Sequence, residues 1–147
     1  MPELTIEDVA DGHVLLEAFA IRREVFCIEQ GVPEAEEMDG HDADCRHYLV
    51  RTLGIAIATA RLMPGPPGVE KVQRVAVKAA HRRRGVGRAL MQRIVEDARG
   101  RGVRRLELDA QCYVEKFYRG LGFVTESEAF MEAGIPHVRM ARTLSAS

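Results

Sequence analysis

The spacing of apolar residues in the first half of the chain predicts one strand, one long helix and a β-hairpin. Leu4–Val9 alternates between apolar and polar residues, as a half-buried strand does. Over Val14–Gln30 the apolar residues recur at helical spacing, and the glycine and proline of Gly31-Val32-Pro33 end the predicted helix. Two strands that meet in a tight turn are predicted next. They are Tyr48–Arg51 and Ile55–Leu62, with Leu53-Gly54 between them.

The second half of the chain alternates between strand-like and helix-like segments. Val72–Val77 predicts a strand, and Ala89–Arg99 predicts a helix whose apolar residues fall on one face. The remaining predicted elements are a strand at Arg105–Ala110, a short helix at Tyr113–Leu121, and strands at Phe123–Thr125 and His137–Thr143. This order predicts an α/β fold, with a mixed central β-sheet flanked by helices, in a single domain over residues 1–147.

A loop rich in arginine and glycine separates the strand Val72–Val77 from the helix that follows it. Glycine allows the backbone to approach a ligand closely, and the unpaired N–H groups at a helix start favour an anion. We therefore expect this loop to bind a phosphorylated ligand at the carboxyl end of a central strand. A helix start with a solvated basic face is the alternative. The loop consists of Arg82, Arg83, Arg84, Gly85, Val86, Gly87 and Arg88.

Composition and charge limit the classes of function. The chain has 21 basic and 22 acidic residues and a formal net charge of −1, which argues against nucleic acid as a partner. Its cysteines, Cys27, Cys45 and Cys112, show no metal-ligand spacing, so we expect neither a metal site nor a disulfide framework. The N-terminal residues lack an apolar signal core, and no apolar run has membrane-spanning length. We therefore expect a cytoplasmic protein without membrane contact.

A second motif lies on the predicted short helix Tyr113–Leu121. It joins the pair Phe117-Tyr118 to the pair Gly122-Phe123. Together with the loop and the strand before it, this motif resembles the GNAT superfamily of acetyl-CoA-dependent N-acetyltransferases. Two further segments, Ile21–Pro33 and Ala133–Met140, are similar to the ElaA/YjcF-type subgroup.

The resemblance implies an acyl-CoA N-acyltransferase fold and an enzyme that moves the acetyl group of acetyl-CoA directly to a primary amine of a small molecule. The loop Arg82–Arg88 would then supply backbone N–H groups to the pyrophosphate of coenzyme A. The strand residues Val75, Ala76 and Val77 would pair with the pantetheine arm, and a backbone N–H there would bind the acetyl carbonyl oxygen. No metal is implied, and a homodimer is an expectation at the level of the family.

Tyr118 and His137 are the expected catalytic residues. Tyr118 matches the position that faces the coenzyme sulfur in many relatives, and a phenol with a reference pKa of about 10 holds a proton that it can donate to the leaving thiolate. His137 lies in a Pro-His-x-x-Met segment similar to the glyphosate N-acetyltransferase group, in which the matching histidine is taken as the general base. Its reference pKa of about 6.5 leaves the imidazole largely neutral at pH 7. A water chain to Glu29 or Glu107 is the alternative route.

The acceptor amine is less well defined by the sequence. The residues expected to bind it are Arg22, Phe26, Gln30 and Arg74, with Arg61 as a further candidate. Where the glyphosate-acetylating group has additional arginines, this chain has Cys27 and Gln111, which argues against a phosphonate acceptor. The acidic segment Glu34–Asp44, predicted to be a loop, favours a cationic group on the acceptor.

Other functions stay open at this point. The chain could be a catalytically inactive regulatory module that binds acyl-CoA, or an acetyltransferase for peptide or protein amines. A nucleic-acid-binding protein that uses Arg82–Arg88 is a further alternative. It predicts an affinity for DNA or RNA that depends strongly on salt.

Overall fold

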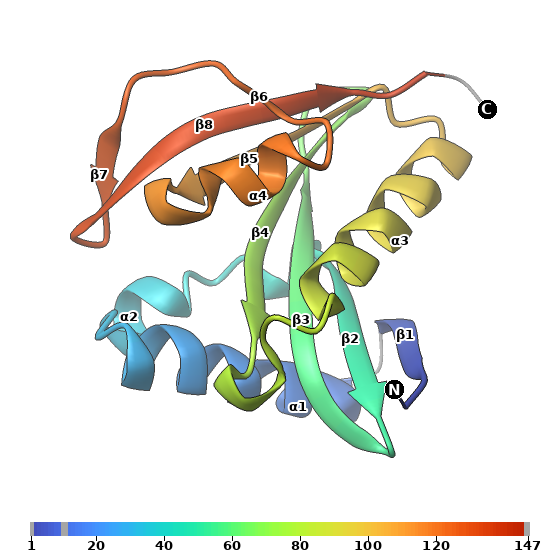
Figure 1. The fold of residues 1–147 in the computed structure, drawn as a ribbon, viewed down its shortest axis with the longest axis vertical. Coiled ribbons are helices and arrows are strands. Elements are labelled where there is room, and N and C mark those ends of the chain that lie inside the picture. The colour runs from blue at the N-terminus through green and yellow to red at the C-terminus, as the bar shows by residue number, and fades with distance from the viewer. Residues whose placement is uncertain (1, 10–11, 146–147) are drawn as a thin grey trace.

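An eight-stranded β-sheet runs through the molecule, and helices cover both of its faces (Figure 1). The computed structural model describes residues 2–9 and 12–145, so both ends of the domain predicted over 1–147 lie outside the described residues. The strands are β1 (Leu4–Val9), β2 (Arg46–Thr52), β3 (Ile55–Pro64), β4 (Val69–Val77), β5 (Arg105–Gln111), β6 (Val124–Thr125), β7 (Phe130–Glu132) and β8 (Ile135–Thr143). The α-helices are α1 (Gly12–Arg22), α2 (Glu34–Glu37), α3 (Val86–Gly100) and α4 (Glu115–Arg119). The other helical segments are the π-helical η1 (Arg23–Glu29) and the 3₁₀ turns η2 (Asp42–Asp44), η3 (Ala79–His81) and η4 (Cys112–Val114).

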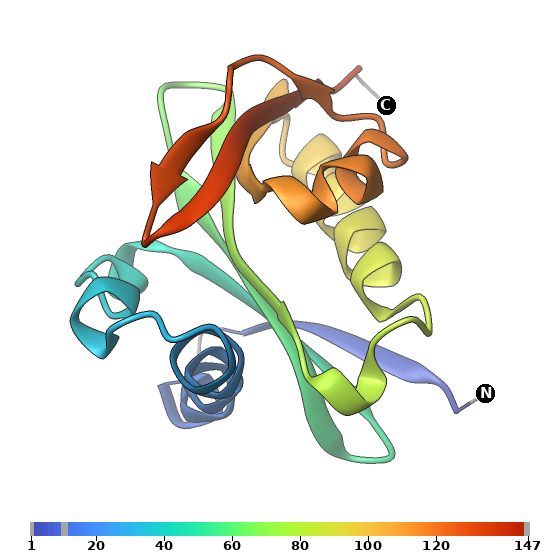
Figure 2. The ribbon, with the colours of Figure 1, turned by 60° about the vertical axis from the view of Figure 1, so that its left-hand side comes forward.

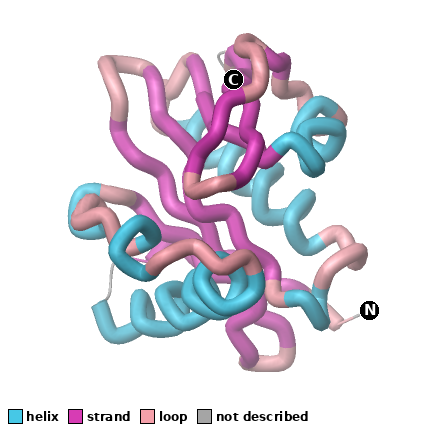
Figure 3. The backbone as a smooth tube through the Cα atoms, turned by 90° about the vertical axis from the view of Figure 1, so that its left-hand side faces the viewer, coloured by secondary structure: helices cyan, strands magenta, loops and turns pink. Residues whose placement is uncertain are grey.

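The predicted mixed sheet with helices on its faces is confirmed. Its strand order is β1-β2-β3-β4-β5-β8-β6, and β7 pairs with β8. The paired strands are antiparallel except for β4 and β5, which are parallel and are connected through α3. Helices α1 and α2 lie on one side of the sheet, and α3 and α4 lie on the other (Figures 2 and 3).

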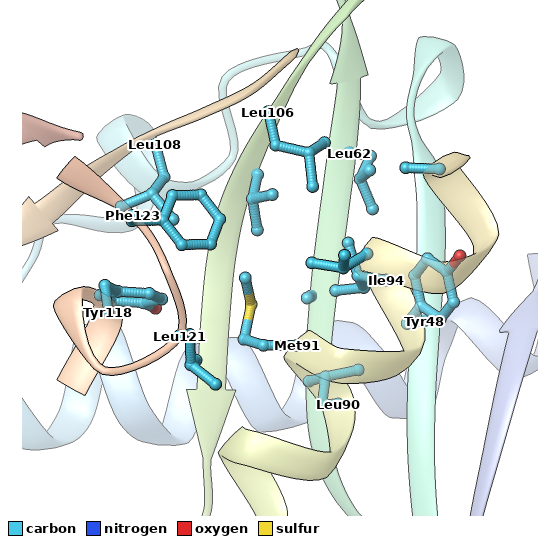
Figure 4. Close-up of a cluster of buried hydrophobic side chains, with 14 of the residues drawn as sticks. Tyr48, Leu62, Leu90, Met91, Ile94, Leu106, Leu108, Tyr118, Leu121 and Phe123 are labelled. Atoms are coloured by element: carbon cyan, nitrogen blue, oxygen red, sulfur yellow. The ribbon is translucent and has the colours of Figure 1, made fainter. Parts of the chain in front are cut away.

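Each face of the sheet has its own hydrophobic core. On one face Leu90, Met91 and Ile94 of α3 pack with Leu62 of β3 and Leu106 of β5 (Figure 4). The smaller core beneath α1 consists of Val9, Ala18, Ile21, Val25, Leu49 and Ala76. Because burial of apolar side chains is the main stabilising force, the two cores fix the strands from which the cleft is built.

The predicted hairpin is present, with its turn at the predicted residues. Strands β2 and β3 pair as far as Thr52 and Ile55. Leu53 and Gly54 between them have φ angles of 50° and 76°. Positive φ at both central residues is the type I′ geometry, whose twist matches that of the flanking strands.

Three segments differ from the sequence-based prediction. The helix predicted over Val14–Gln30 changes from α-helical to π-helical winding after Arg22, a change that apolar spacing cannot resolve over so few turns. The segment Glu34–Asp44 is not a plain loop, because it contains α2 and η2. Strand β7 was not predicted, because its three residues are too few to show an alternation.

The helical turns of this acidic segment are held by arginines from α1 and β3. Arg22 is 1% exposed and bonds Glu37 at 2.5 Å and Asp42 at 2.7 Å. Arg61 is fully buried and bonds Asp39 at 2.5 Å and Asp42 at 2.9 Å. Its hydrogen bonds hold the pKa of the Asp39 carboxyl well below the usual range. The partners come from distant parts of the sequence, so the local pattern could not indicate this structure.

We expect Arg61→Met to destabilise the protein by about 3 to 5 kcal/mol, because Asp39 loses its main partner and the partly buried Asp42 keeps only Arg22. Urea unfolding of the variant and the wild type measures this difference. Arg46→Met is the matched control, since Arg46 bonds Asp8 near the surface, where an ion pair contributes about 1 kcal/mol or less. Equal losses for the two variants would contradict the structural role of Arg61.

Candidate active site

A cleft of about 960 Å³ opens where β4 and β5 separate. The two parallel strands are paired only from Val69 with Arg105 to Val72 with Leu108. Beyond Val72, the edge of β4 that faces β5 has no strand partner among the described residues. Its backbone N–H and C=O groups, except the Val77 carbonyl, which accepts a hydrogen bond from Arg82, are therefore available to a ligand that lies between the two strands.

A β-bulge lies in β4 beside this edge. Thr59 of β3 pairs with Ala76 and Arg61 pairs with Gln73, so β4 has one extra residue between these pairs. Arg74 in the bulge has a φ of 55°, a left-handed conformation that is unfavourable for arginine. Bulges bend a strand and re-aim its groups, and here the bend leads β4 away from β5.

The arginine–glycine loop closes one end of the cleft and leads into α3. Gly85 is the first flanking residue of the helix, with a φ of 78°, and no side chain caps the helix start. The first N–H groups of α3 are therefore unpaired. A Cβ atom on Gly87 would lie 3.4 Å from the Phe117 ring, an ordinary van der Waals contact. This geometry suits an anion in contact with the backbone.

Most of the residues predicted for the site line this one cleft. They are Phe26, Gln30, Arg74, Val75, Ala76, Val77, Arg82, Arg83, Gly85, Val86, Gly87, Arg88, Tyr118 and His137. Arg22 and Arg84 do not line it. Arg84 is exposed on the outside of the loop, and Arg22 is occupied by Glu37 and Asp42, so Arg22 holds α2 in place and does not face an acceptor.

The guanidinium of Arg82 is already occupied. It bonds both carboxylate oxygens of Glu29 at 2.6 and 2.9 Å, and its Nε–H donates to the carbonyl of Val77 at 2.8 Å. The hydrogen bonds that Arg82 donates to Glu29 raise the pKa of its guanidinium. Arg82 therefore ties η1 to the loop. The same pair occupies Glu29, one of the two carboxylates considered as an alternative base.

Glu107, the other alternative base, is also paired and lies outside the cleft wall. It accepts a hydrogen bond from Arg105 at 2.9 Å and lies 3.9 Å from Arg139. Cys112 likewise does not line the cleft. Among the described residues, no group of three histidine, cysteine, aspartate or glutamate side chains is arranged to hold a metal ion.

Tyr118 lies on α4 at the inner wall of the cleft, where it is 7% exposed (Figure 4). Its ring packs edge-on against the rings of Phe117 and Phe123, with distances between ring centroids of 5.0 and 6.0 Å. The hydroxyl has no hydrogen-bond partner among the residues that the structure describes. Burial, with a smaller contribution from Tyr113, raises the pKa of Tyr118 well above its ordinary value. The phenol therefore keeps its proton at neutral pH.

His137 lies on β8 with its ring held from two sides. Its Nδ1 is 2.7 Å from the carbonyl oxygen of Ile135, and because a carbonyl only accepts, Nδ1 carries the proton. The ring of Phe130 in β7 stacks on the imidazole, with 6.1 Å between the ring centroids. The lone pair of Nε2 is thus free to accept a proton, which is the state that a general base requires.

Glu132 is a cleft residue that the sequence analysis missed. Its carboxylate lies 3.6 Å from Nε2 of His137, at the mouth of the cleft. It is placed there by the turn Ala133-Gly134, with φ angles of 51° and 75°, which joins β7 to β8. The signal that could have found it was this glycine turn between Phe130–Glu132 and the strand that follows.

Two glutamine side chains are hydrogen-bonded to each other across the cleft. Gln30 of the α1 side and Gln111 of β5 bond each other at 2.9 and 3.4 Å. Arg74 lines the same region and donates to the carbonyl oxygen of Glu37 at 3.1 Å, and burial lowers its pKa. The carboxylates of the acidic segment are mostly neutralised by arginines, so they give less support to a cationic acceptor than the sequence indicated. Glu36 is exposed and has no ion-pair partner among the described residues.

Comparison with known proteins gives a consistent result. Residues 14–144 match the model of the acetyltransferase (GNAT) domain. The chain is 33% identical to the N-acetyltransferase YjcF of Bacillus subtilis over 129 residues, which cover 87% of this chain and 91% of YjcF. The crystal structure of Escherichia coli ElaA superposes with a TM-score of 0.84 at 30% identity, covering 97% of this chain and 99% of ElaA. An acyl-CoA N-acyltransferase from Pseudomonas aeruginosa gives 0.83 at 30% identity with the same coverage. No described helix is long and apolar enough to cross a membrane.

Proposed function

Because the chain belongs to the GNAT family of acetyltransferases, we propose that it moves the acetyl group of acetyl-CoA to the primary amine of a small molecule. The main support is that the groups needed for this reaction lie in one place. One cleft joins the uncapped start of α3, the free edge of β4, a buried tyrosine and a histidine with a free Nε2.

The two halves of the cleft suit the two substrates. The N–H groups at the start of α3 suit the pyrophosphate of acetyl-CoA, and the free edge of β4 from Gln73 to Val77 suits the amides of its pantetheine arm. The acceptor enters from the opposite side, between Gln30 and the β7–β8 turn. The walls provided by α2, η1 and this turn make a small acceptor the best fit.

The reaction needs a neutral amine, a stabilised oxyanion and a protonated thiolate. His137 takes a proton from the acceptor ammonium at Nε2, and the amine then attacks the acetyl carbonyl carbon. The new C–N bond gives a tetrahedral oxyanion, which a backbone N–H of β4 stabilises; one such donor typically contributes about 3 kcal/mol. The C–S bond then breaks as Tyr118 donates its proton to the sulfur of coenzyme A. The nitrogen of the intermediate releases its extra proton to solvent to give the neutral amide, and Tyr118 regains a proton from solvent.

A thiol-release assay with acetyl-CoA and a panel of amines tests the proposed function directly. The panel contains small primary amines, peptide N-termini and lysine peptides. We expect turnover with at least one small amine. Turnover with peptides alone would show that the acceptor is a peptide amine and not a small molecule. Tight binding of acetyl-CoA without turnover for any acceptor would indicate a regulatory binding module.

We expect Tyr118→Phe to lower kcat by about 10²- to 10⁴-fold, because the leaving thiolate loses its proton donor. The affinity for acetyl-CoA should stay close to that of the wild type. Tyr48→Phe is the control, since it removes a buried hydroxyl that bonds Asp97 outside the cleft. An unchanged kcat for Tyr118→Phe would remove this tyrosine from the mechanism.

We expect His137→Ala to lower kcat by about 10²- to 10⁴-fold at pH 7 through loss of the general base. The difference in kcat between the variant and the wild type should become smaller as the pH rises, because a growing share of the acceptor amine is then deprotonated without His137. Rate profiles from pH 6 to 10 measure this, with the exposed His41→Ala as the control. A deficit that is the same at every pH would show that His137 is not the base.

A further inference from the structure

Most of the carboxylates that line the cleft are already paired with cations of the protein. Glu37, Asp39 and Asp109 each form an ion pair with an arginine or a lysine. Within the described chain, the cleft carboxylates without such a partner are those of Glu36 on α2 and Glu132 on β7. The β7–β8 turn lies next to α2, so the negative charge that the fold leaves unpaired gathers on this side of the cleft (Figures 1 and 2).

The arginines that the cleft leaves unpaired lie elsewhere. Among its lysines and arginines, Lys71, Arg74 and Arg82 are each paired with a carboxylate. Arg83 and Arg88 have no carboxylate partner in the part of the chain that the structure describes, and both belong to the loop at the start of α3. The cleft therefore has unpaired positive charge at the start of α3 and unpaired negative charge beside the β7–β8 turn.

Glu132 and His137 present two hydrogen-bond acceptors to each other. His137 is 6% exposed, and because its Nδ1 carries the proton, its Nε2 presents a lone pair. Oε2 of Glu132 lies 3.6 Å from Nε2, and the lone pair has no hydrogen-bond donor among the described residues. Two acceptors at this distance repel each other unless a donor lies beside both. The buried imidazole therefore points to a ligand that supplies N–H groups.

We propose that Glu132 binds the ammonium group of the acceptor, and that the acceptor carries no carboxylate next to this amine. The inference rests on the proposed function. A primary ammonium has three N–H donors, and its nitrogen can lie about 2.9 Å from both Oε2 of Glu132 and Nε2 of His137, to one side of the line that joins them. A carboxylate on the adjacent carbon would lie close to Glu132 without an unpaired arginine or lysine to compensate it.

The proton transfer then keeps the positive charge beside Glu132. An N–H bond of the ammonium breaks and its electron pair stays on the amine nitrogen, while Nε2 of His137 uses its lone pair to form a new N–H bond. The amine becomes the neutral nucleophile, and the imidazolium faces the carboxylate of Glu132 at 3.6 Å. After acetyl transfer the imidazolium releases its proton to solvent. Because Glu132 compensates one unit of positive charge before and after the transfer, it affects binding of the acceptor more than the rate.

Steady-state kinetics of Glu132→Gln test this binding role, with acetyl-CoA and the small amine of the panel that gives the fastest turnover. We expect the KM for the amine to rise about five- to tenfold, the effect of one hydrogen bond to a charged group. The kcat should change less than this KM, and the KM for acetyl-CoA should stay that of the wild type. Glu132→Asp keeps the charge and should recover most of the affinity.

Glu128→Gln is the matched control, since Glu128 is an exposed glutamate between β6 and β7 that does not line the cleft. It should leave the KM for the amine unchanged. An unchanged KM in Glu132→Gln, or a fall in kcat alone, would overturn the inference. A rise in KM for Glu36→Gln but not for Glu132→Gln would also overturn it, because the ammonium would then bind at α2.

Two molecules that differ by one carboxylate test the class of acceptor. Phenethylamine and phenylalanine are each added as competitors of the same amine. We expect phenethylamine to compete with the wild type at a concentration about tenfold lower than phenylalanine, and this difference to become smaller in Glu132→Gln, because like charges disfavour binding. No difference between the two competitors would overturn the inference and leave the proposed function standing. Absence of turnover with every amine would contradict the proposed function itself.

Discussion

The separation of β4 from β5 is the constraint on which the rest of the site depends. A parallel pair that stayed in register would use its own backbone groups, and no edge would be left for a ligand. Here the pairing ends at Val72 and Leu108, and the bulge at Arg74 directs β4 away. The cores on both faces of the sheet keep the two strands fixed in this open arrangement. The cleft is therefore built into the sheet.

The ion pairs beneath α2 position one wall of the cleft. Arg22 and Arg61 are buried almost completely, and each is bonded to two carboxylates. Buried charges of this kind contribute little net stability compared with an apolar core, but they fix geometry, because breaking one pair leaves a charge without compensation. These ion pairs thereby hold the acidic segment Glu34–Asp44, which has no hydrophobic face of its own, in one conformation at the wall of the cleft. Its charge serves the fold more than the recognition of a substrate.

Much of the fold was predictable because it depends on local signals. The type I′ turn at Leu53-Gly54, the uncapped helix after Gly85 and the motif around Tyr118 each follow from residues that are neighbours in sequence. The rest depends on partners that are distant in sequence. Nothing local indicates that Arg22 faces Glu37 and Asp42, or that Glu132 comes to lie beside His137 through a strand of three residues.

Arginines that look alike in the sequence have different roles in the structure. Arg82 and Arg88 belong to one loop and looked equivalent in the sequence. In the structure, Arg82 is neutralised by Glu29 and fastens η1 to the loop, whereas no carboxylate among the described residues faces Arg88. A guanidinium with a protein partner gains little by exchanging it for a ligand, because a hydrogen bond is lost for each one made. An unpartnered guanidinium in a cleft has no such cost. The arginines that the fold leaves unpaired are therefore the ones whose charge is available to a ligand.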